Sequence, residues 1–248
     1  MEYSRWAPTY ERIRADLGFA MAQEVAAADA LVALLPPAAP DRPLERIAER
    51  LRGRETIVVG DAPGSGPPPL WRLASPGPRP AILAADGATA SCVRAGLVPD
   101  VIVTDLDGPV ASEVTANQRG ALVVIHAHGD NRAAVADWGR QFSGELAGSW
   151  AGPPRDGLLD VGGFTDGDRG AYLAEHVGAR RILLWGFDFE RVVEADELRA
   201  ARKRAKLRWA AIALGELSRA SPTPIELWRR DGTRVPYAAA GISAESTR

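Results

Sequence analysis

The hydrophobic pattern of the chain changes near residue 55. Before this point, apolar residues recur at helical spacing over Tyr10–Leu35, which predicts one or two amphipathic helices. After a proline-rich break the pattern resumes over Leu44–Leu51 as a short helix. Beyond residue 55, short apolar runs alternate with helical stretches. We therefore expect a small helical region at residues 1–52 and an α/β catalytic domain at residues 53–248.

The second part of the chain predicts a mostly parallel, Rossmann-like sheet with helices on both faces. Continuous apolar strands that alternate with helices are typical of such a sheet, because its strands are buried on both sides. The expected strands are Thr56–Val59, Ala81–Ala84, Val101–Val103, Ala121–Ile125, Leu158–Val161, Arg181–Trp185 and Ile225–Trp228. The expected helices between them are Ala88–Ala95, Val110–Gln118, Arg132–Phe142, Asp168–Val177 and Ala195–Ser218.

Composition excludes several classes of protein. The 248 residues carry 30 basic and 32 acidic side chains, so a protein that coats nucleic acid is not expected. No apolar run approaches the roughly 18–20 residues of a membrane span. A single cysteine excludes a disulfide framework. We expect a cytoplasmic protein that binds neither nucleic acid nor membranes, and self-association stays open.

Six expected strands are followed by glycine together with aspartate or histidine. These segments are Gly60-Asp61, Asp86-Gly87, Thr104–Gly108, His126–Asn131, Gly162–Arg169 and Gly186–Asp188. Ligands of open α/β sheets bind at the carboxyl ends of the strands, where glycine lets backbone approach them. A single aspartate there is explained as a helix N-cap. The whole series predicts an active site.

Asp105 and Asp107 are the strongest candidate metal ligands. In an extended chain, residues i and i+2 point to the same side, and two neighbouring carboxylates need a cation between them. Oxygen ligands of this kind suit Mg²⁺ and point to phosphate chemistry. Asp130, Asp166 and Asp168 follow neighbouring strands and are able to complete one or two metal positions. The alternative is a solvated acidic rim.

The histidines and lysines admit two readings each. His126 and His128 share a face, but zinc needs about three nitrogen or sulfur ligands, so a phosphate-contacting or structural role is favoured. Lys203 and Lys206 are the only lysines of the chain and lie three positions apart on one expected helix. They either reach a polyphosphate or belong to a solvated basic face.

Four motifs in order resemble the archaeal MptE-like 6-hydroxymethyl-7,8-dihydropterin pyrophosphokinases. They are TDLDG (Thr104–Gly108), HAHGDN (His126–Asn131), GGFTDGDR (Gly162–Arg169) and GFDF (Gly186–Phe189). The segment ADGA (Ala85–Ala88), which precedes an Asp-x-Asp pair, is also similar to thiamine pyrophosphokinases, whose fold the family shares. The chain departs from the family at Gly60–Pro67, where a compact Gly-x-Gly-Pro-Ser-Leu turn is usual. Phosphate contacts at that turn are therefore open.

The resemblance implies a Mg²⁺-dependent transfer of diphosphate from ATP to the hydroxymethyl group of the dihydropterin, with release of AMP. Asp105, Asp107 and Asp130 are the metal ligands that it implies, and His128 or a carboxylate takes the substrate proton. The substrate- and nucleotide-binding residues expected are Asp86, Gly87, His126, Asn131, Gly162, Gly163, Phe164, Thr165, Asp166, Asp168, Asp188, Lys203 and Lys206. Among them, Asp166 is our predicted anchor for the pterin ring, with Asp188 second and Phe164 as a stacking face.

Three rival functions remain at this stage. The segment VIVTDLDG imitates the nucleophile motif of haloacid-dehalogenase-type phosphatases, although that motif normally ends the first strand of its domain. A non-catalytic nucleotide-binding module is the second rival. The third is the same diphosphate transfer to thiamine or another hydroxymethyl acceptor.

Overall fold

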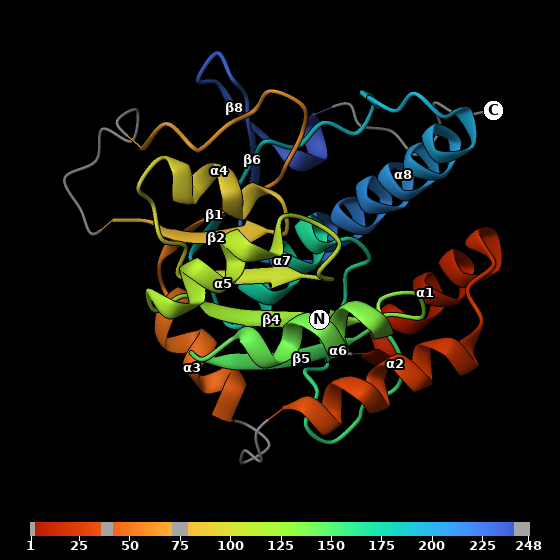
Figure 1. Cartoon of the computed structure of the whole chain (residues 1–248). Helices are drawn as coiled ribbons and strands as arrows, with labels where there is room; N and C mark the ends of the chain where they lie inside the picture. The colour runs from red at the N-terminus through yellow and green to blue at the C-terminus, as the bar shows by residue number, and fades with distance from the viewer. Residues whose placement is uncertain (1–2, 36–41, 71–78, 241–248) are drawn as a thin grey trace.

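The computed structural model describes residues 3–35, 42–70 and 79–240 (Figure 1). They form an eight-stranded sheet in the order β5-β4-β3-β2-β1-β6-β7-β8. Neighbours from β5 to β7 are parallel, and β8 pairs with β7 in the antiparallel direction. The strands are β1 (Glu55–Val59), β2 (Ala81–Ala85), β3 (Val101–Thr104), β4 (Leu122–Ala127), β5 (Leu146–Trp150), β6 (Arg181–Trp185), β7 (Ile225–Trp228) and β8 (Arg234–Pro236). The expected α/β class with a mostly parallel sheet is confirmed.

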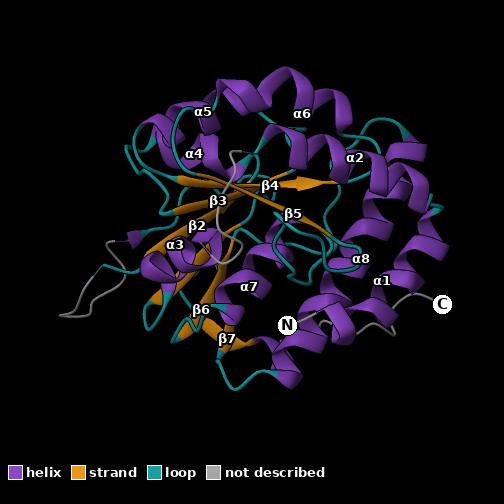
Figure 2. Ribbon diagram, turned by 90° about the horizontal axis from the view of Figure 1, so that it is seen from below, coloured by secondary structure: helices purple, strands orange, loops and turns teal. Residues whose placement is uncertain are grey.

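Helices cover both faces of this sheet (Figure 2). Side chains of α1, α3, α7 and α8 pack on one face, and those of α2, α4, α5 and α6 on the other. The helices are α1 (Tyr3–Leu17), α2 (Met21–Leu34), α3 (Arg42–Leu51), α4 (Ala88–Arg94), α5 (Val110–Gln118), α6 (Arg132–Trp138), α7 (Asp166–His176) and α8 (Glu197–Ala220). Short 3₁₀ turns follow α6 at Gly139–Gln141 and β8 at Tyr237–Ala239.

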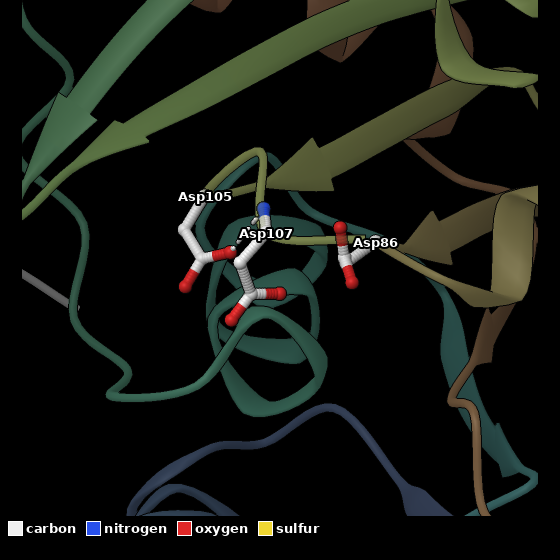
Figure 3. Close-up of side chains that lie close together, drawn as sticks. All are labelled: Asp86, Asp105 and Asp107. Atoms are coloured by element: carbon white, nitrogen blue, oxygen red, sulfur yellow. Dashed lines mark hydrogen bonds between the residues drawn. The ribbon is translucent and has the colours of Figure 1, made fainter. Parts of the chain in front are cut away.

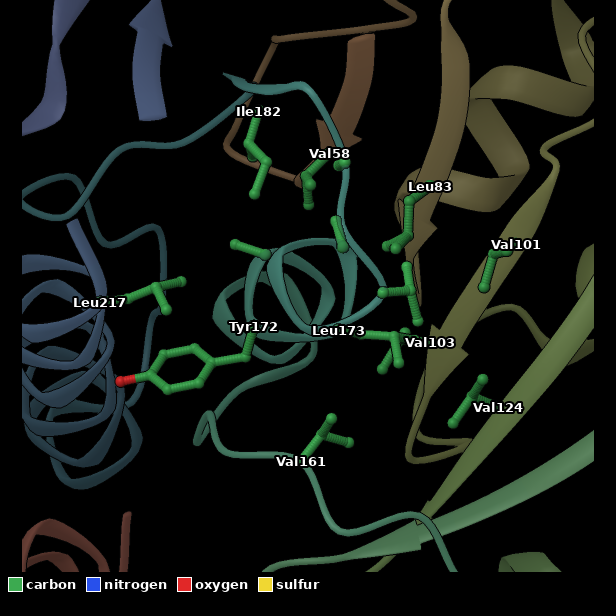
Figure 4. Packing of buried hydrophobic residues seen from close by; sticks show 14 of the residues in the cluster. Val58, Leu83, Val101, Val103, Val124, Val161, Tyr172, Leu173, Ile182 and Leu217 are labelled. Atoms are coloured by element: carbon green, nitrogen blue, oxygen red, sulfur yellow. The ribbon is translucent and has the colours of Figure 1, made fainter. Parts of the chain in front are cut away.

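The core explains why the strands read as continuous apolar runs. Successive residues such as Ile57 and Val58 point to opposite faces, and both are fully buried by the helices on either side. On one face, α7 lies across β1, β2 and β3 and inserts Leu173 among their side chains (Figure 4). The hydroxyl of Tyr172 donates to the carbonyl of Ala213, 2.9 Å away, which ties α7 to α8. This packing fixes the N-terminus of α7 near the carboxyl ends of the strands.

The expected N-terminal helical region is confirmed, and it shares the core of the sheet. Ile13 of α1 belongs to the cluster on the α7 face, and Leu31 of α2 to the cluster on the opposite face. Within the described ranges, no single helix is long and apolar enough to cross a membrane. Helices α1 and α2 reach that length and composition only together, with a bend of 115° between them.

One expected strand is wrong and one strand is missed, at opposite edges of the sheet. The fifth strand is Leu146–Trp150 rather than the expected Leu158–Val161, which makes only an isolated bridge from Leu159 to Ser149. Gly148 and Ser149 weaken the strand signal of β5, because glycine is unfavourable inside a strand. Here Gly148 makes room for Leu158, whose side chain would lie 2.6 Å from an added Cβ. Strand β8 was not expected, and its Pro236 is tolerated because β8 is an edge strand.

The order of strands reverses beside β1. The chain proceeds from β1 to β2 on one side, whereas β6 and β7 lie on the other side. Crevices at such switch points bind ligands in open α/β sheets. Gly60 and Gly186, which follow β1 and β6, pass so close that a Cβ on Gly186 would lie 2.4 Å from the Gly60 carbonyl oxygen. Gly186 also has a φ of +72°, so both its conformation and its contact require glycine.

Candidate active site

A pocket of about 370 Å³ lies at the carboxyl ends of the strands. Loops after β1, β2, β3, β4 and β6 line it, together with the N-terminus of α7 and one side of α8. Residues of the N-terminal region, Tyr10, Phe19 and Glu24, complete the lining. The predicted position of the site at the strand ends therefore coincides with a pocket.

Asp86, Asp105 and Asp107 gather in this pocket (Figure 3). One oxygen of each carboxylate lies within 4.8 Å of an oxygen of the other two. Asp86 follows β2, and the other two follow β3. Gly108 permits the arrangement, since a Cβ there would lie 2.4 Å from an Asp86 oxygen.

The turn after β3 differs from the extended chain expected from the sequence. Leu106 has a φ of +66°, a left-handed conformation that is rare for a residue other than glycine, and its side chain is buried. Its N–H donates to Thr104 Oγ1 at 2.9 Å, and the Asp107 N–H donates to Asp105 Oδ1 at 3.2 Å. The second such conformation among the described residues is at Asp86, with a φ of 38°. Backbone strain of this kind concentrates at functional sites.

The charges of these carboxylates are not balanced within the cluster. Burial and the charges of Asp105 and Asp86 raise the pKa of Asp107 to about 6. The pKa of Asp166, at the start of α7, is raised well above its usual range by burial and by Asp105 and Asp86. Carboxylates that repel one another in this way fit a divalent cation, and an all-oxygen set fits Mg²⁺.

Asp130 lies outside this cluster and pairs with His128 instead. His128 Nε2 is 2.9 Å from Asp105 Oδ2, and its Nδ1 contacts Asp130 Oδ1. Burial lowers the pKa of His128, but the hydrogen bonds to the two aspartates outweigh it and raise the value to about 9. The bond to His128 in turn lowers the pKa of Asp130 to about 2. The expected metal set therefore differs from the observed cluster by one residue, with Asp86 in the place of Asp130.

Four of the expected binding residues support the pocket without lining it. The Asn131 amide donates to the carbonyls of Asp105 and His126 and thereby ties the turn after β3 to the end of β4. Asp168 accepts the N–H groups of Phe164 and Thr165 and caps α7. Gly162 and Gly163 leave space for the Tyr172 ring and the Arg169 backbone. Their part in the site is to shape it.

The remaining expected residues all face the pocket. They are Asp86, Gly87, Asp105, Asp107, His126, His128, Asp130, Phe164, Thr165, Asp166, Asp188, Lys203 and Lys206. Lys206 acts electrostatically on Asp105, Asp107 and Asp130, and Lys203 on Asp61. The two lysines thus border the acidic cluster from α8, as the polyphosphate reading requires. His126 is kept neutral, because burial and the charges of Arg169 and His128 lower its pKa well below 6.5.

Several lining residues are absent from the expected metal-, substrate- and nucleotide-binding sets. Asp61, in a strand-end segment that the sequence marks as part of the site, brings a further carboxylate from the unusual turn after β1. Burial, followed by the charge of Asp86, raises its pKa. Arg169 belongs to the GGFTDGDR motif but was not singled out as a site residue. Tyr10, Phe19 and Glu24 carry no motif, and only the packing of α1 and α2 on the domain brings them to the pocket.

Comparison with known proteins gives these observations a family. The family model described as 6-hydroxymethylpterin diphosphokinase MptE-like matches residues 41–193 of this chain. The chain belongs to the MptE-like family. The matched range contains the acidic cluster, the His128 loop and the start of α7, while α1, α2 and α8 lie outside it. The family membership expected from the four motifs is confirmed.

Two relatives extend the match beyond that range. The 6-hydroxymethyl-7,8-dihydropterin pyrophosphokinase of Methanothermobacter thermautotrophicus is 35% identical over 238 residues, which cover 92% of this chain and all of that protein. The protein of the same name from Pyrococcus furiosus is 35% identical over 199 residues, covering 78% of this chain and 80% of that one. Among solved structures, the MAf glycosyltransferase from Magnetospirillum magneticum AMB-1 is 15% identical with a TM-score of 0.44, over 76% of this chain and 36% of that chain.

Proposed function

We propose that the protein transfers the terminal diphosphate of ATP to the hydroxymethyl group of 6-hydroxymethyl-7,8-dihydropterin and releases AMP, with Mg²⁺ as cofactor. The observation that carries this proposal is the cluster of Asp86, Asp105 and Asp107 bordered by Lys203 and Lys206 in one pocket. Carboxylates facing ammonium groups suit a metal–polyphosphate complex. The names of the two relatives supply the acceptor.

The reaction is a displacement at the β-phosphorus of ATP. The hydroxymethyl oxygen forms a bond to this phosphorus while the bond to the α,β-bridging oxygen breaks, and AMP leaves with that oxygen. Asp86, Asp105 and Asp107 would hold Mg²⁺, which would supply neutralisation of the charge on the phosphate oxygens. Positioning supplies most of the remaining acceleration, so the protein has to hold the two substrates in line.

The residues around the cluster have distinct tasks in this proposal. Lys203 and Lys206 attract the triphosphate as point charges. His128 has carboxylates at both ring nitrogens, so it holds Asp105 in place as a cation rather than accepting the substrate proton. A carboxylate oxygen of the cluster takes that proton. The position of TDLDG after the third strand of the chain disfavours the phosphatase alternative, whose motif normally ends the first strand of its domain.

The decisive experiment compares acceptors. We expect AMP to form from ATP and Mg²⁺ with 6-hydroxymethyl-7,8-dihydropterin and far more slowly with thiamine. Phosphate-labelled ATP would show both transferred phosphates on the pterin product. Turnover of thiamine alone would reassign the acceptor. If no AMP forms with either acceptor, the proposal is rejected in favour of a non-catalytic nucleotide-binding module.

A further inference from the structure

The pocket has a second end whose chemistry differs from that of the acidic cluster. Tyr10, Phe19 and Glu24 from the N-terminal helices meet Phe164 and Arg169 from the start of α7. The Phe19 and Phe164 rings lie 6.2 Å apart and form an apolar wall. Glu24 and Arg169 add one carboxylate and one guanidinium, both almost completely buried. Such a mixed, aromatic end fits a flat heterocycle with polar edges rather than a phosphate chain.

Local structure places the N-terminal part of this end. Helix α1 ends at Leu17, Gly18 follows with a φ of +73°, and the Arg14 side chain donates to the Phe19 carbonyl at 2.7 Å. This cap turns Phe19 toward Phe164. Glu24 lies in the first turn of α2 and accepts the Gly129 N–H at 3.0 Å and the Tyr10 hydroxyl at 3.2 Å. A carboxylate has about four acceptor positions, so two donors leave Glu24 able to accept more.

Arg169 has a spare hydrogen-bond donor, whereas Glu24 has spare acceptor positions. Its side chain is 1% exposed, and within the part of the chain that is described its Nε has no hydrogen-bond partner. Its Nη atoms reach the Val161 and Phe164 carbonyls only at 3.5 Å. A buried guanidinium with an unsatisfied donor is costly, because the desolvation of that group is not repaid. An acceptor atom on a bound molecule would repay it.

We propose that Glu24 and Arg169 recognise the 2-amino-4-oxo edge of the dihydropterin, with Phe19 and Phe164 as the wall beside its ring. This assignment rests on the proposed function. The edge offers two adjacent N–H donors, which a carboxylate accepts as a pair, and a carbonyl oxygen, which a guanidinium satisfies. The aminopyrimidine of thiamine has no carbonyl at the matching position, so the same residues discriminate between the two acceptors.

This assignment replaces Asp166 as the expected pterin anchor. Asp166 lies between the two ends: burial and the charges of Asp105 and Asp86 raise its pKa, and the charge of Arg169 lowers it. We assign Asp166 to the metal and phosphate end, because three carboxylates act on it from that side. Glu24 is instead hydrogen-bonded to the loop that carries His128 and Asp130. That bond joins the α2 side of the pocket to the catalytic loops.

The test measures which edge of the heterocycle the protein recognises, in the absence of metal and ATP. We would titrate the full chain with 6-methyl-7,8-dihydropterin, which cannot react, and with 6-methyl-7,8-dihydrolumazine, which has oxygen in place of the 2-amino group. The wild type should prefer the pterin. Glu24→Gln should lower pterin affinity about ten- to a hundredfold and leave lumazine binding unchanged or stronger, because its amide donates to the 2-oxo group.

Matched variants separate recognition from folding. Asp29→Asn removes an exposed carboxylate of the same helix outside the pocket and should leave both affinities unchanged. Phe19→Ala, at a half-buried side chain, should weaken the binding of both compounds equally. The aromatic wall is proposed to lie beside the ring and not at the edge in which the two compounds differ. Unchanged affinities in Phe19→Ala would contradict the wall.

The outcomes also separate this assignment from the proposed function. Equal losses of affinity for pterin and lumazine in Glu24→Gln would show that Glu24 has only a structural role, holding α2 against the Gly129 loop. Loss of the pterin preference in Asp166→Asn alone would return the anchor to Asp166. Either result, with dihydropterin turnover by the wild type, overturns only the assignment. A wild type that neither binds the pterin nor turns over the dihydropterin overturns the proposed function itself.

Discussion

The two ends of the pocket are built in different ways. The acidic end comes from short loops after adjacent parallel strands, so Asp86, Asp105 and Asp107 meet because β2 and β3 are neighbours. The aromatic end joins side chains more than a hundred residues apart, such as Phe19 and Phe164. Its parts meet only after α1, α2 and α7 have packed on the sheet. The proposed phosphate chemistry thus depends on local turns, and the proposed recognition of the acceptor depends on tertiary packing.

The two ends of the pocket also differ in their electrostatics. At the acidic end, burial and like charges raise the pKa values of Asp107 and Asp166, and a bound cation would relieve the repulsion. At the aromatic end, a buried carboxylate and a buried guanidinium face the pocket together. In the proposed function, the first end takes metal and phosphate and the second takes a neutral heterocycle. Mutations at the two ends should therefore fail in different assays.

The largest effect is expected when the acidic cluster is altered. Asp86→Asn should lower turnover by about 10²–10³-fold and weaken Mg²⁺ binding, because it removes one of three clustered carboxylates. Asp130→Asn should cost only about tenfold in turnover and keep Mg²⁺ binding, because Asp130 contacts His128. Mg²⁺ titrations of AMP release and calorimetry would measure both. Equal loss of Mg²⁺ binding in the two variants would restore Asp130 to the metal set.

A smaller effect is expected from the lysine side of the acidic end. Lys206→Ala should raise the KM for ATP about tenfold and leave pterin binding unchanged, since the ammonium acts on phosphate charge. Arg204→Ala is the matched control, because Arg204 is exposed on the same helix and pairs with Glu197. Initial rates at varied ATP would decide. A Lys206→Ala enzyme with wild-type ATP kinetics would favour the solvated-face reading.

The sequence predicts the acidic end better than the aromatic end, for a physical reason. Strand-end aspartates are visible because strands, glycines and motifs are local, and parallel neighbours bring their ends together. The difference over Asp130 arises one step later, where side-chain contacts matter. His128 lies between Asp105 and Asp130 and contacts both, and no spacing rule reveals that.

The aromatic end and the edge strands are features that local sequence patterns do not predict. Tyr10 and Glu24 resemble ordinary helix residues in the sequence. Only the folded chain shows that they line the pocket and that Glu24 contacts both Tyr10 and Gly129. Strand β5 was missed because Gly148 and Ser149 interrupt its apolar run, whereas Leu158–Val161 has the apolar character of a strand without its pairing. Both cases depend on packing partners that are distant in the chain.

The smallest effect concerns a carboxyl behind the acidic end. Glu113 of α5 is fully buried, and burial together with the charge of Asp86 raises its pKa to about 9. The folded protein therefore holds a proton there that the unfolded chain releases above about pH 4.5. This contribution to stability is complete below that pH and is lost as pH rises toward 9. Glu113→Gln, which needs no proton, should gain stability relative to the wild type across this range, by about 1 kcal/mol at pH 8 after the cost of burying its amide.

Denaturant unfolding in EDTA at pH 4, 6 and 8 would measure that difference. Mg²⁺ should shrink it, because a cation on Asp86 removes part of the field that raises the Glu113 pKa. Ala111→Ser, at an exposed site on the same helix, serves as the control without a pH-dependent effect. A constant difference between Glu113→Gln and the wild type from pH 4 to 8 would show that the pKa of Glu113 is not raised, and a difference unaffected by Mg²⁺ would show that burial alone raises it. A difference that grows with pH and shrinks with Mg²⁺ would tie the buried carboxyl to the metal site, so that the acidic end extends beyond the pocket into the core beneath α5.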